Sequence, residues 1–238
     1  MYKKLLVLAG TKVVACLPAS DFPSENPRPQ ARNFPYTNTL YAIFSQLPMI
    51  ESLLQNIENV IKVSEDLKAR IISISKAEIV KKDKFIHRPN KVCDKTYFIS
   101  SGLIRIYYEK GEKEVTDNFA AENEWITSIY SFMKNVPDNC YIQTLEDSEL
   151  IAINIYELEK CFADFPEMER FGRILISKYF VEQSERIISL QFHTAKERYE
   201  YFSKQSANKL GRVPLGMLAS HLGITQETLS RVRAEITF

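Results

Sequence analysis

The sequence predicts an α+β fold in which an antiparallel β-roll is followed by one long helix and a C-terminal helical domain. Apolar residues recur every three or four positions before residue 77 and after residue 155, as in amphipathic helices, and alternate in between, as in strands. Turns such as Ser101-Gly102 and Lys110-Gly111 separate the alternating stretches. With 238 residues, of which 45% are hydrophobic and 26% charged, the chain suits one or two globular domains.

Residues 1–35 are predicted to form a poorly ordered extension. Five of the ten prolines fall there, and each removes a backbone donor and fixes φ. Lys3-Lys4 and the apolar residues after them superficially resemble a signal peptide, but Lys12 interrupts the apolar run. The chain has no run of 18 or more apolar residues, so we expect no membrane-spanning helix.

The cysteines and histidines predict neither a metal site nor a cofactor. The chain has four cysteines: Cys16, Cys93, Cys140 and Cys161. None belongs to a C-x-x-C pair, so we expect isolated thiols in a reducing cytoplasm. The chain has three histidines, which lie far apart in the sequence: His87, His193 and His221.

A sensor domain made of the β-roll and its preceding helices is predicted over residues 36–165. Residues 36–74 show helical spacing, and Ser64 followed by acidic residues indicates a helix start. Short strands separated by turns are predicted at residues 96–99, 103–108, 115–120, 125–129, 141–145 and 149–155. Such a series is typical of a small antiparallel roll or barrel.

Residues 166–192 are predicted to form a single dimerisation helix, with Pro166 in its first turn. Its length of about 40 Å is more than one small core needs. An aliphatic seam repeats every seven residues, with serines between its members: Ile174, Val181 and Ile188, with Ser177 and Ser184. This seam favours pairing with a second copy of the helix. Alternatively, the helix is buried along its own roll through Ile176, Phe180, Ile187 and Leu190.

Residues 193–238 are predicted to hold a helix-turn-helix unit. Ala219 is the small residue where the two helices close on each other, and Gly223 makes the turn. Thr225 is placed to cap the second helix. The packing positions are apolar: Leu218, Leu222, Ile224, Leu229 and Val232.

With these apolar positions buried, polar side chains that suit contact with DNA are left on the outer face. The candidate DNA-binding residues are Thr225, Gln226, Glu227, Ser230, Arg231 and Arg233. Arg231 can donate two hydrogen bonds to guanine, and Glu227 can accept one from cytosine. Gln226 and Ser230 can contact a base or a phosphate.

This order of elements resembles the catabolite-activator/fumarate–nitrate-regulator (Crp/Fnr) family of transcription factors, and most closely its branch common in Bacteroidetes. The stretches that carry the resemblance are Lys95-Thr96-Tyr97-Phe98-Ile99-Ser100-Ser101-Gly102-Leu103, Lys113-Glu114-Val115-Thr116, Ser189-Leu190-Gln191-Phe192, Arg198-Tyr199 and Leu222-Gly223-Ile224-Thr225-Gln226-Glu227-Thr228-Leu229-Ser230-Arg231. Glu227, Ser230 and Arg231 match the family's E-x-x-S-R pattern, which implies half-sites with a G·A core. The resemblance implies a homodimer that reads a palindromic operator on double-stranded DNA.

The effector of the roll is not identified by the sequence. Alignment with the family's cyclic-nucleotide motif gives a candidate effector pocket at Trp125, Ser128, Asn139 and Cys140. Ser128 stands at the motif's glutamate and Asn139 at its phosphate-binding arginine, and no glycine occurs between Gly111 and Gly172. We therefore expect the chain not to respond to cAMP, and an unknown small-molecule effector stays open.

The net charge of +1 conceals a segregation of charge along the chain. Residues 112–169 hold 14 acidic and 3 basic side chains, a net of −11. Residues 193–238 hold 7 basic and 4 acidic side chains, a net of +3. The basic side chains expected to contact phosphates are Lys204, Lys209, Arg212, Arg231 and Arg233.

Two other classes of function are alternatives to a DNA-binding regulator. An enzyme is not expected, because no nucleophile–base pair, metal cluster or phosphate-binding loop can be assembled from the sequence. The second alternative is a β-roll sensor that acts through protein–protein contacts and carries a degenerate helix-turn-helix.

Overall fold

The structure, a computed structural model, describes residues 6–8, 11–13 and 35–236. Strands β1 (Leu6–Leu8) and β2 (Thr11–Val13) pair with each other in antiparallel fashion. The predicted extension of residues 1–35 and the signal-peptide-like segment otherwise lie outside the described residues. By its internal contacts the chain divides into two units, Met1–Leu40 and Tyr41–Phe238.

Two helices precede the roll: α1 (Pro35–Glu58) and α2 (Glu65–Ile74). The predicted start at Ser64 is confirmed, because the Leu67 amide donates to the Ser64 hydroxyl over 3.2 Å and caps α2. Leu53 and Ile57 of α1 are fully buried in the core that the helices share with the roll. None of the helices in the described part of the chain combines the length and apolar character needed to cross a bilayer.

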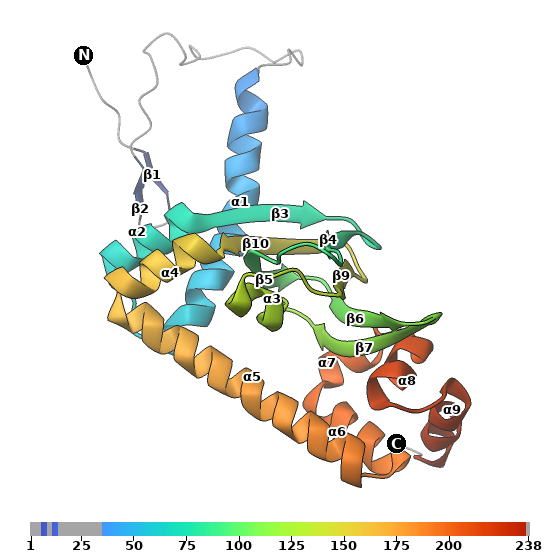
Figure 1. The fold of residues 1–238 in the computed structure, drawn as a ribbon. Coiled ribbons are helices and arrows are strands. Elements are labelled where there is room, and N and C mark those ends of the chain that lie inside the picture. The colour runs from blue at the N-terminus through green and yellow to red at the C-terminus, as the bar shows by residue number, and fades with distance from the viewer. Residues whose placement is uncertain (1–5, 9–10, 14–34, 237–238) are drawn as a thin grey trace, which may run out of the picture. The chain divides into compact units, whose positions relative to one another are not determined.

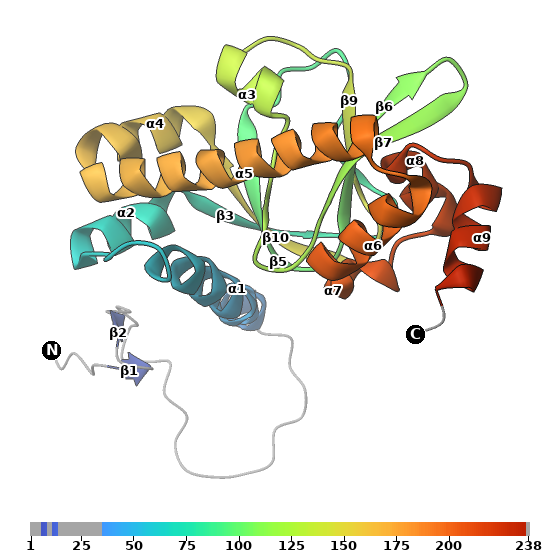
Figure 2. The same ribbon diagram turned by 90° about the horizontal axis from the view of Figure 1, so that it is seen from below.

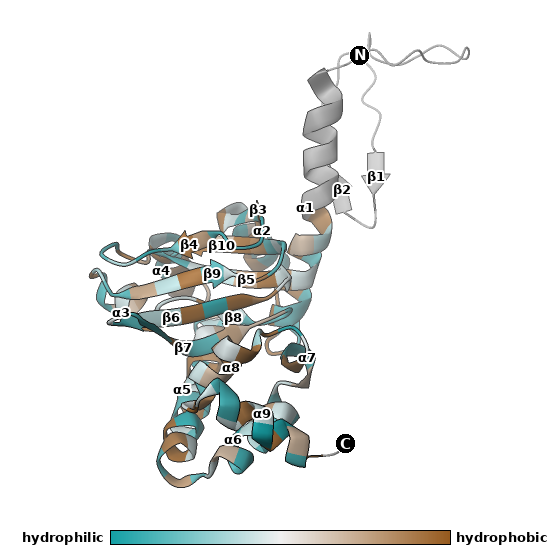
Figure 3. Cartoon of the chain, turned by 90° about the vertical axis from the view of Figure 1, so that its right-hand side faces the viewer, coloured by the Kyte–Doolittle hydropathy of each residue, from teal (hydrophilic) through white to brown (hydrophobic). Residues whose placement is uncertain are grey.

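The β-roll consists of two four-stranded sheets, with strand orders β3-β10-β5-β8 and β4-β9-β6-β7 (Figure 1). The bounds of the strands are β3 (Ser75–Val80), β4 (Phe85–His87), β5 (Lys95–Ser101), β6 (Ile104–Lys110), β7 (Lys113–Ala120), β8 (Trp125–Ile126), β9 (Cys140–Thr144) and β10 (Ser148–Asn154). All pairs of neighbouring strands are antiparallel. Apolar residues gather on the central strands of both sheets (Figure 3). The predicted fold class is confirmed.

The roll differs from the prediction at three places. The predicted strand over residues 125–129 ends at Ile126, because the Ser128 side chain caps the short helix α3 (Ile129–Lys134). Strands β3 and β4 were missed. Both lie at sheet edges, where one side of the strand faces solvent and the apolar alternation is weak.

The helical part of the chain follows the roll. Helix α4 (Ile155–Asp164) leads into α5 (Pro166–Phe192), whose bounds are those predicted for the long helix. Pro166 stands at the first helical position, where its missing N–H has no intrahelical partner to lose. Helix α5 passes along the roll toward the C-terminal helices α6 (Ala195–Gln205), α7 (Ala207–Leu210), α8 (Leu215–Leu222) and α9 (Gln226–Glu235) (Figure 2).

Gly102 closes the turn between β5 and β6. Its φ is +109°, a region that favours glycine, and a Cβ added there would lie 2.8 Å from the Ser148 Cα. Gly111, in the turn between β6 and β7, has a φ of +62° but open space around it. A substitution at Gly111 therefore measures the cost of the positive φ alone, whereas one at Gly102 adds a steric clash.

We expect Gly102→Ala to lower the free energy of unfolding by about 2–4 kcal/mol, because strain and overpacking add. Gly111→Ala is the matched control and should cost about 1 kcal/mol from strain alone. Urea unfolding followed by circular dichroism measures both. Equal losses in the two variants would contradict the steric argument.

Candidate functional site

Helices α8 and α9 lie where the sequence predicts a helix-turn-helix, and a short turn at Gly223 joins them. Gly223 ends α8 in the left-handed region, with a φ of +66°. The Ile224 amide then donates to the Ala219 carbonyl over 3.0 Å. The predicted packing residues are buried, with Ile224 partly so: Leu218, Ala219, Leu222, Leu229 and Val232. This packing fixes the crossing of the two helices.

The outer face of α9 carries the residues that sequence analysis singled out. Thr225 caps the helix, because the Thr228 amide donates to its hydroxyl over 3.2 Å. The exposed side chains are Thr225, Gln226, Glu227, Ser230, Arg231 and Arg233. The pKa of Glu227 is lowered by its own backbone N–H, by the Thr225 hydroxyl and by Arg231. This face therefore presents an anionic acceptor beside the guanidinium group of Arg231.

Arg198 joins the ends of three helices. Its guanidinium donates to the carbonyls of Leu190 over 2.8 Å and His193 over 3.0 Å, at the C-terminal end of α5. It also donates to the carbonyl of Leu222 over 3.0 Å, at the end of α8. These carbonyls have no further turn of helix to bond with, so a cation that fills them is stabilising. Arg198 itself belongs to α6, so α5, α6 and α8 meet at one side chain.

A second arginine joins the helical domain to the roll. Arg212 lies between two carboxylates of the roll, 2.8 Å from Glu122 and 2.5 Å from Glu146. We call these three residues the carboxylate clamp. The guanidinium of Arg212 holds the pKa of Glu122 down to about 2, and the two carboxylates raise the pKa of Arg212.

Lys209 makes a similar contact. Its ammonium lies 2.7 Å from the Glu124 carboxylate and donates to the Phe119 carbonyl over 3.0 Å. The prediction that Lys209 and Arg212 contact phosphates is therefore wrong for this arrangement, because both are paired within the chain. Lys204 is exposed, as are the two α9 arginines.

Apolar packing and backbone bonds accompany these ion pairs. Leu103 and Phe119 of the roll belong to the same buried cluster as Leu218 of α8 and Leu229 of α9. The Ser220 hydroxyl of α8 accepts from the Thr116 amide of β7 over 3.0 Å and donates to the Glu114 carbonyl over 2.8 Å. The C-terminal helices and the roll therefore share one of the apolar clusters of the chain.

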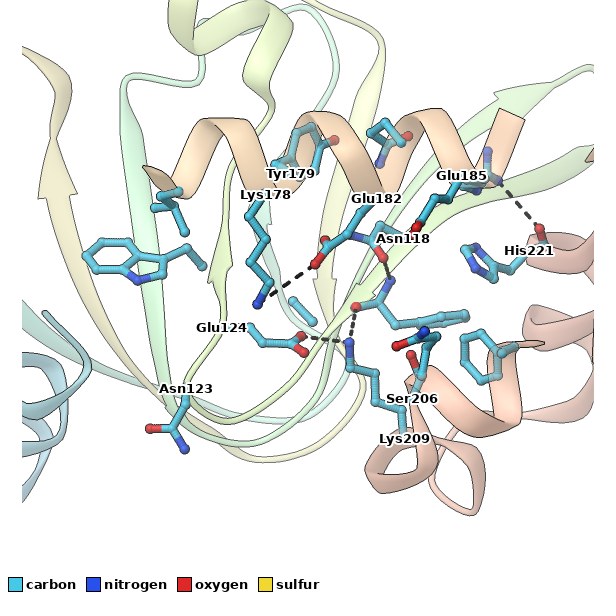
Figure 4. A pocket seen from close by; sticks show the side chains of 18 of the residues that line it. Asn118, Asn123, Glu124, Lys178, Tyr179, Glu182, Glu185, Ser206, Lys209 and His221 are labelled. Atoms are coloured by element: carbon cyan, nitrogen blue, oxygen red, sulfur yellow. Dashed lines mark hydrogen bonds and ion pairs between the residues drawn. The ribbon is translucent and has the colours of Figure 1, made fainter. Parts of the chain in front are cut away.

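A polar cavity of about 400 Å³ lies between α5, the roll and the helical domain (Figure 4). Lys178 and Glu182 of α5 face it, 3.8 Å apart, opposite the Lys209–Glu124 pair. His221 of α8 also lines it. Burial, helped by Arg186 and Lys209, lowers the pKa of His221 to about 3, so its imidazole is neutral at pH 7.

Helix α5 exposes a wide apolar surface. Its exposed apolar side chains are Ile176, Phe180, Val181, Ile187, Ile188 and Phe192. The alternative interpretation placed Ile176, Phe180, Ile187 and Leu190 against the roll. It is wrong for the first three, since 43–70% of each is exposed, whereas Leu190 is half-buried and lines the polar cavity. Met168 and Phe171 face the core instead. Of the predicted seam, Val181 and Ile188 lie within this exposed surface, whereas Ile174 is half-buried and lines the polar cavity.

The four residues predicted for an effector pocket do not line one cavity. Trp125 borders the polar cavity and a second, mostly apolar one of about 360 Å³ between β8, α3 and α5. Ser128 and Cys140 are buried, and both bond to the Asp138 carboxylate. Asn139 is exposed. Alignment to a motif could not reveal that the Asp138 carboxylate accepts hydrogen bonds from the Ser128 hydroxyl and the Cys140 thiol.

Sequence analysis also missed a group of polar side chains around Asp138. His87 Nε2 lies 2.9 Å from Asp138 Oδ1, although 51 residues separate the two. Burial opposes a charge on the imidazole, but the thiols of Cys140 and Cys93 and the Asp138 carboxylate raise the pKa of His87 to about 11. Cys93, Cys140 and Cys161 are free and buried, and Cys16 lies outside the described residues.

Comparison with known proteins supports the assignment of the fold. Residues 77–165 match the family model of the cyclic nucleotide-binding domain. No curated protein sequence matches the chain.

Three solved structures are similar to much of the chain. FixK2 from Bradyrhizobium japonicum has a TM-score of 0.60 at 16% identity, over 68% of this chain and 84% of that one. A CooA mutant from Carboxydothermus hydrogenoformans has a TM-score of 0.58 at 19% identity, over 69% and 77%. A protein from Eubacterium rectale, described as a transcriptional regulator of the Crp/Fnr family, has a TM-score of 0.56 at 17% identity, over 73% and 83%. The chain has the fold of this group.

The clamp predicts an acid-sensitive stability. The folded-state pKa of Glu122 lies below its usual value of 4.5. The pairing with Arg212 therefore contributes fully to the free energy of unfolding at neutral pH. It is lost as the pH falls from about 4.5 toward 2. Because solvent screens this partly exposed pair, we expect it to supply about 1–2 kcal/mol.

Glu122→Gln should therefore lower the free energy of unfolding at pH 7 and lose less of it between pH 5 and 3 than the wild type does. Glu112→Gln removes an exposed glutamate in the turn before β7 and is the matched control. Chemical denaturation at each pH measures the effect. A wild-type pH profile in Glu122→Gln would refute the linkage.

Proposed function

We propose that the chain is a homodimeric, sequence-specific DNA-binding transcription regulator of the Crp/Fnr type. The observation that carries this proposal is the outer face of α9, where six polar residues are exposed above the buried Leu229 and Val232. The helix is capped, packed from below and unobstructed on its outer face within the described chain. A recognition helix has these properties.

The chemistry of this face suits the edges of base pairs in the major groove. Arg231 donates to guanine, and Glu227 accepts from cytosine. Thr225 and Gln226 stand at the N-terminal end of α9, where backbone amides also attract a phosphate. Arg233 and Lys204 supply the contacts to the backbone of DNA, which position the protein without reading its sequence.

The exposed surface of α5 supports dimerisation. Six large apolar side chains on one helix are more than an isolated chain ordinarily exposes in one patch. Pairing with the same surface of a second copy buries them and sets two α9 helices against the two halves of a palindrome.

The surroundings of Asp138 argue against cAMP as the effector. The residues that align with the motif's ribose-binding glutamate and with its Ser/Thr are Ser128 and Cys140. Both already bond to the Asp138 carboxylate. An anionic cyclic phosphate at this place would meet a carboxylate and no arginine of the motif.

The contacts around α5 suggest how a signal at the roll reaches the DNA. Arg186 of α5 donates to the Thr116 carbonyl of β7 over 3.0 Å, and Arg198 ties the end of α5 to α8. A shift of α5 relative to the roll therefore strains both the Arg186 contact with β7 and the Arg198 contact with α8. A signal that favours the shifted arrangement changes the spacing of the two recognition helices.

The first test of this proposal is Arg231→Ala. Operator sites are first selected from random DNA with the purified chain. The variant should then lose about 1–3 kcal/mol of discrimination at one base pair of each half-site, because one bidentate contact is removed. Competition binding with single-base operator variants measures it.

Arg233→Ala is the control for backbone contact. It should weaken binding to the selected sites and to random DNA equally. It should also reduce the salt dependence of binding by about one charge per half-site. If Arg231→Ala behaves in the same way, α9 does not read bases through this residue. If the wild-type chain selects no sequence, the sensor that acts through protein contacts is favoured.

The second test addresses the dimer. Val181→Glu combined with Ile188→Glu places two carboxylates in the exposed apolar surface of α5, and we expect monomers and roughly half the salt dependence of DNA binding. Sedimentation velocity measures the oligomeric state, and circular dichroism shows whether the fold is kept. Ile79→Glu adds one carboxylate at an exposed apolar position of β3, outside α5, and should stay dimeric. A folded, dimeric double variant would exclude this surface as the interface.

A further inference from the structure

Three side chains of different chemistry meet inside the roll. His87 comes from β4, Asp138 precedes β9, and Cys140 is the first residue of β9. The ligand atoms of the three side chains all lie within 4.8 Å of one another. The side chains of His87 and Asp138 are each 6% exposed, and Cys140 is fully buried.

The backbone holds these three residues in place. Strands β4 and β9 are neighbours in one sheet, and His87 pairs with Ile142 in their register. Asp138 accepts from the Cys140 amide over 3.3 Å and from the Ser128 hydroxyl, which fixes the orientation of its carboxylate. The pairing of β4 with β9 positions the three side chains, and hydrogen bonds orient the Asp138 carboxylate. Metal ligands in proteins are usually held in this way.

We propose that His87, Asp138 and Cys140 form a binding site for one Zn²⁺ ion. Imidazole nitrogen, carboxylate oxygen and thiolate sulfur are its three preferred protein donors, at about 2.0–2.3 Å from the ion. Tetrahedral ligands at these distances lie about 3.3–3.8 Å apart. The His87–Asp138 contact at 2.9 Å has to lengthen slightly, and the Cys140–Asp138 contact at 3.3 Å already has this length.

In the structure, His87 and Cys140 both bond to the Asp138 carboxylate. His87 Nε2 lies 2.9 Å from Asp138 Oδ1, and the Cys140 thiol donates to Asp138 Oδ2 over 3.3 Å. The ion has to displace the protons of the imidazole and the thiol, and it replaces both bonds with bonds to itself. The Asp138 carboxylate is the central partner in both states.

The site lies where its occupancy can be felt elsewhere. Ser128, which bonds to Asp138, is also the N-cap of α3. Phe132 and Met133 of α3 line the apolar cavity together with α5. Metal binding that moves the Asp138 carboxylate therefore acts on α3 beside the long helix. The binding site itself does not depend on the proposed DNA binding.

The test is metal stoichiometry on the full chain, stripped with a chelator and dialysed against Zn²⁺. We expect one Zn²⁺ per chain by elemental analysis, with binding weakened at least tenfold in Cys140→Ser and Asp138→Asn. Cys161→Ser removes a buried thiol in α4, outside this group, and should keep one ion per chain. Zinc uptake below one ion per chain, or uptake unchanged in both ligand variants, would overturn the site.

A spectroscopic arm on the wild-type chain guards against variants that fail to fold. Zinc X-ray absorption should show a mixed shell containing sulfur together with nitrogen or oxygen. Co²⁺ in place of zinc should give a thiolate charge-transfer band. A shell of nitrogen and oxygen alone, or a Co²⁺ complex without that band, would place the metal on other residues and refute the assignment.

Discussion

The pairing of Arg212 with Glu122 and Glu146 is the interaction on which the arrangement of the helical domain against the roll depends. The Arg212 guanidinium belongs to the basic C-terminal segment, and both carboxylates belong to the acidic roll. The opposite charges that are separated along the sequence therefore pair with each other in the fold. The Glu122 carboxylate also accepts from the Gly102 amide over 2.9 Å, which links the clamp to the turn between β5 and β6. The apolar cluster shared by Leu103 and Leu218 lies in the same contact and completes it.

Local chemistry explains what could be predicted from the sequence. Ser64, Pro166, Gly223 and Thr225 determine helix ends through their own side chains or dihedral angles, so each was found without knowledge of the fold. The same holds for the exposed face of α9, which follows from helical periodicity once Leu229 and its neighbours are buried. Strands β3 and β4 were missed because edge strands carry little apolar alternation.

Contacts between distant residues explain what could not be predicted. Lys209 and Arg212 look like phosphate ligands in a basic tail, and only the fold brings Glu124 and Glu146 to them. His87 and Asp138 are 51 residues apart in the sequence, and the pairing of β4 with β9 brings them into contact. An alignment of positions, such as the one that gave the effector pocket, predicts where residues stand along a motif and not which neighbours take up their bonds.

Arg198 gives the molecule a mechanical property. One guanidinium donates to the last carbonyls of α5 and of α8, so it joins the end of the long helix directly to α8. Three bonds that share one planar group resist bending in more than one direction, whereas a single bond acts as a pivot. A small tilt at the start of α5 then moves α8 together with the end of α5. The displacement grows along the 27 residues of the helix.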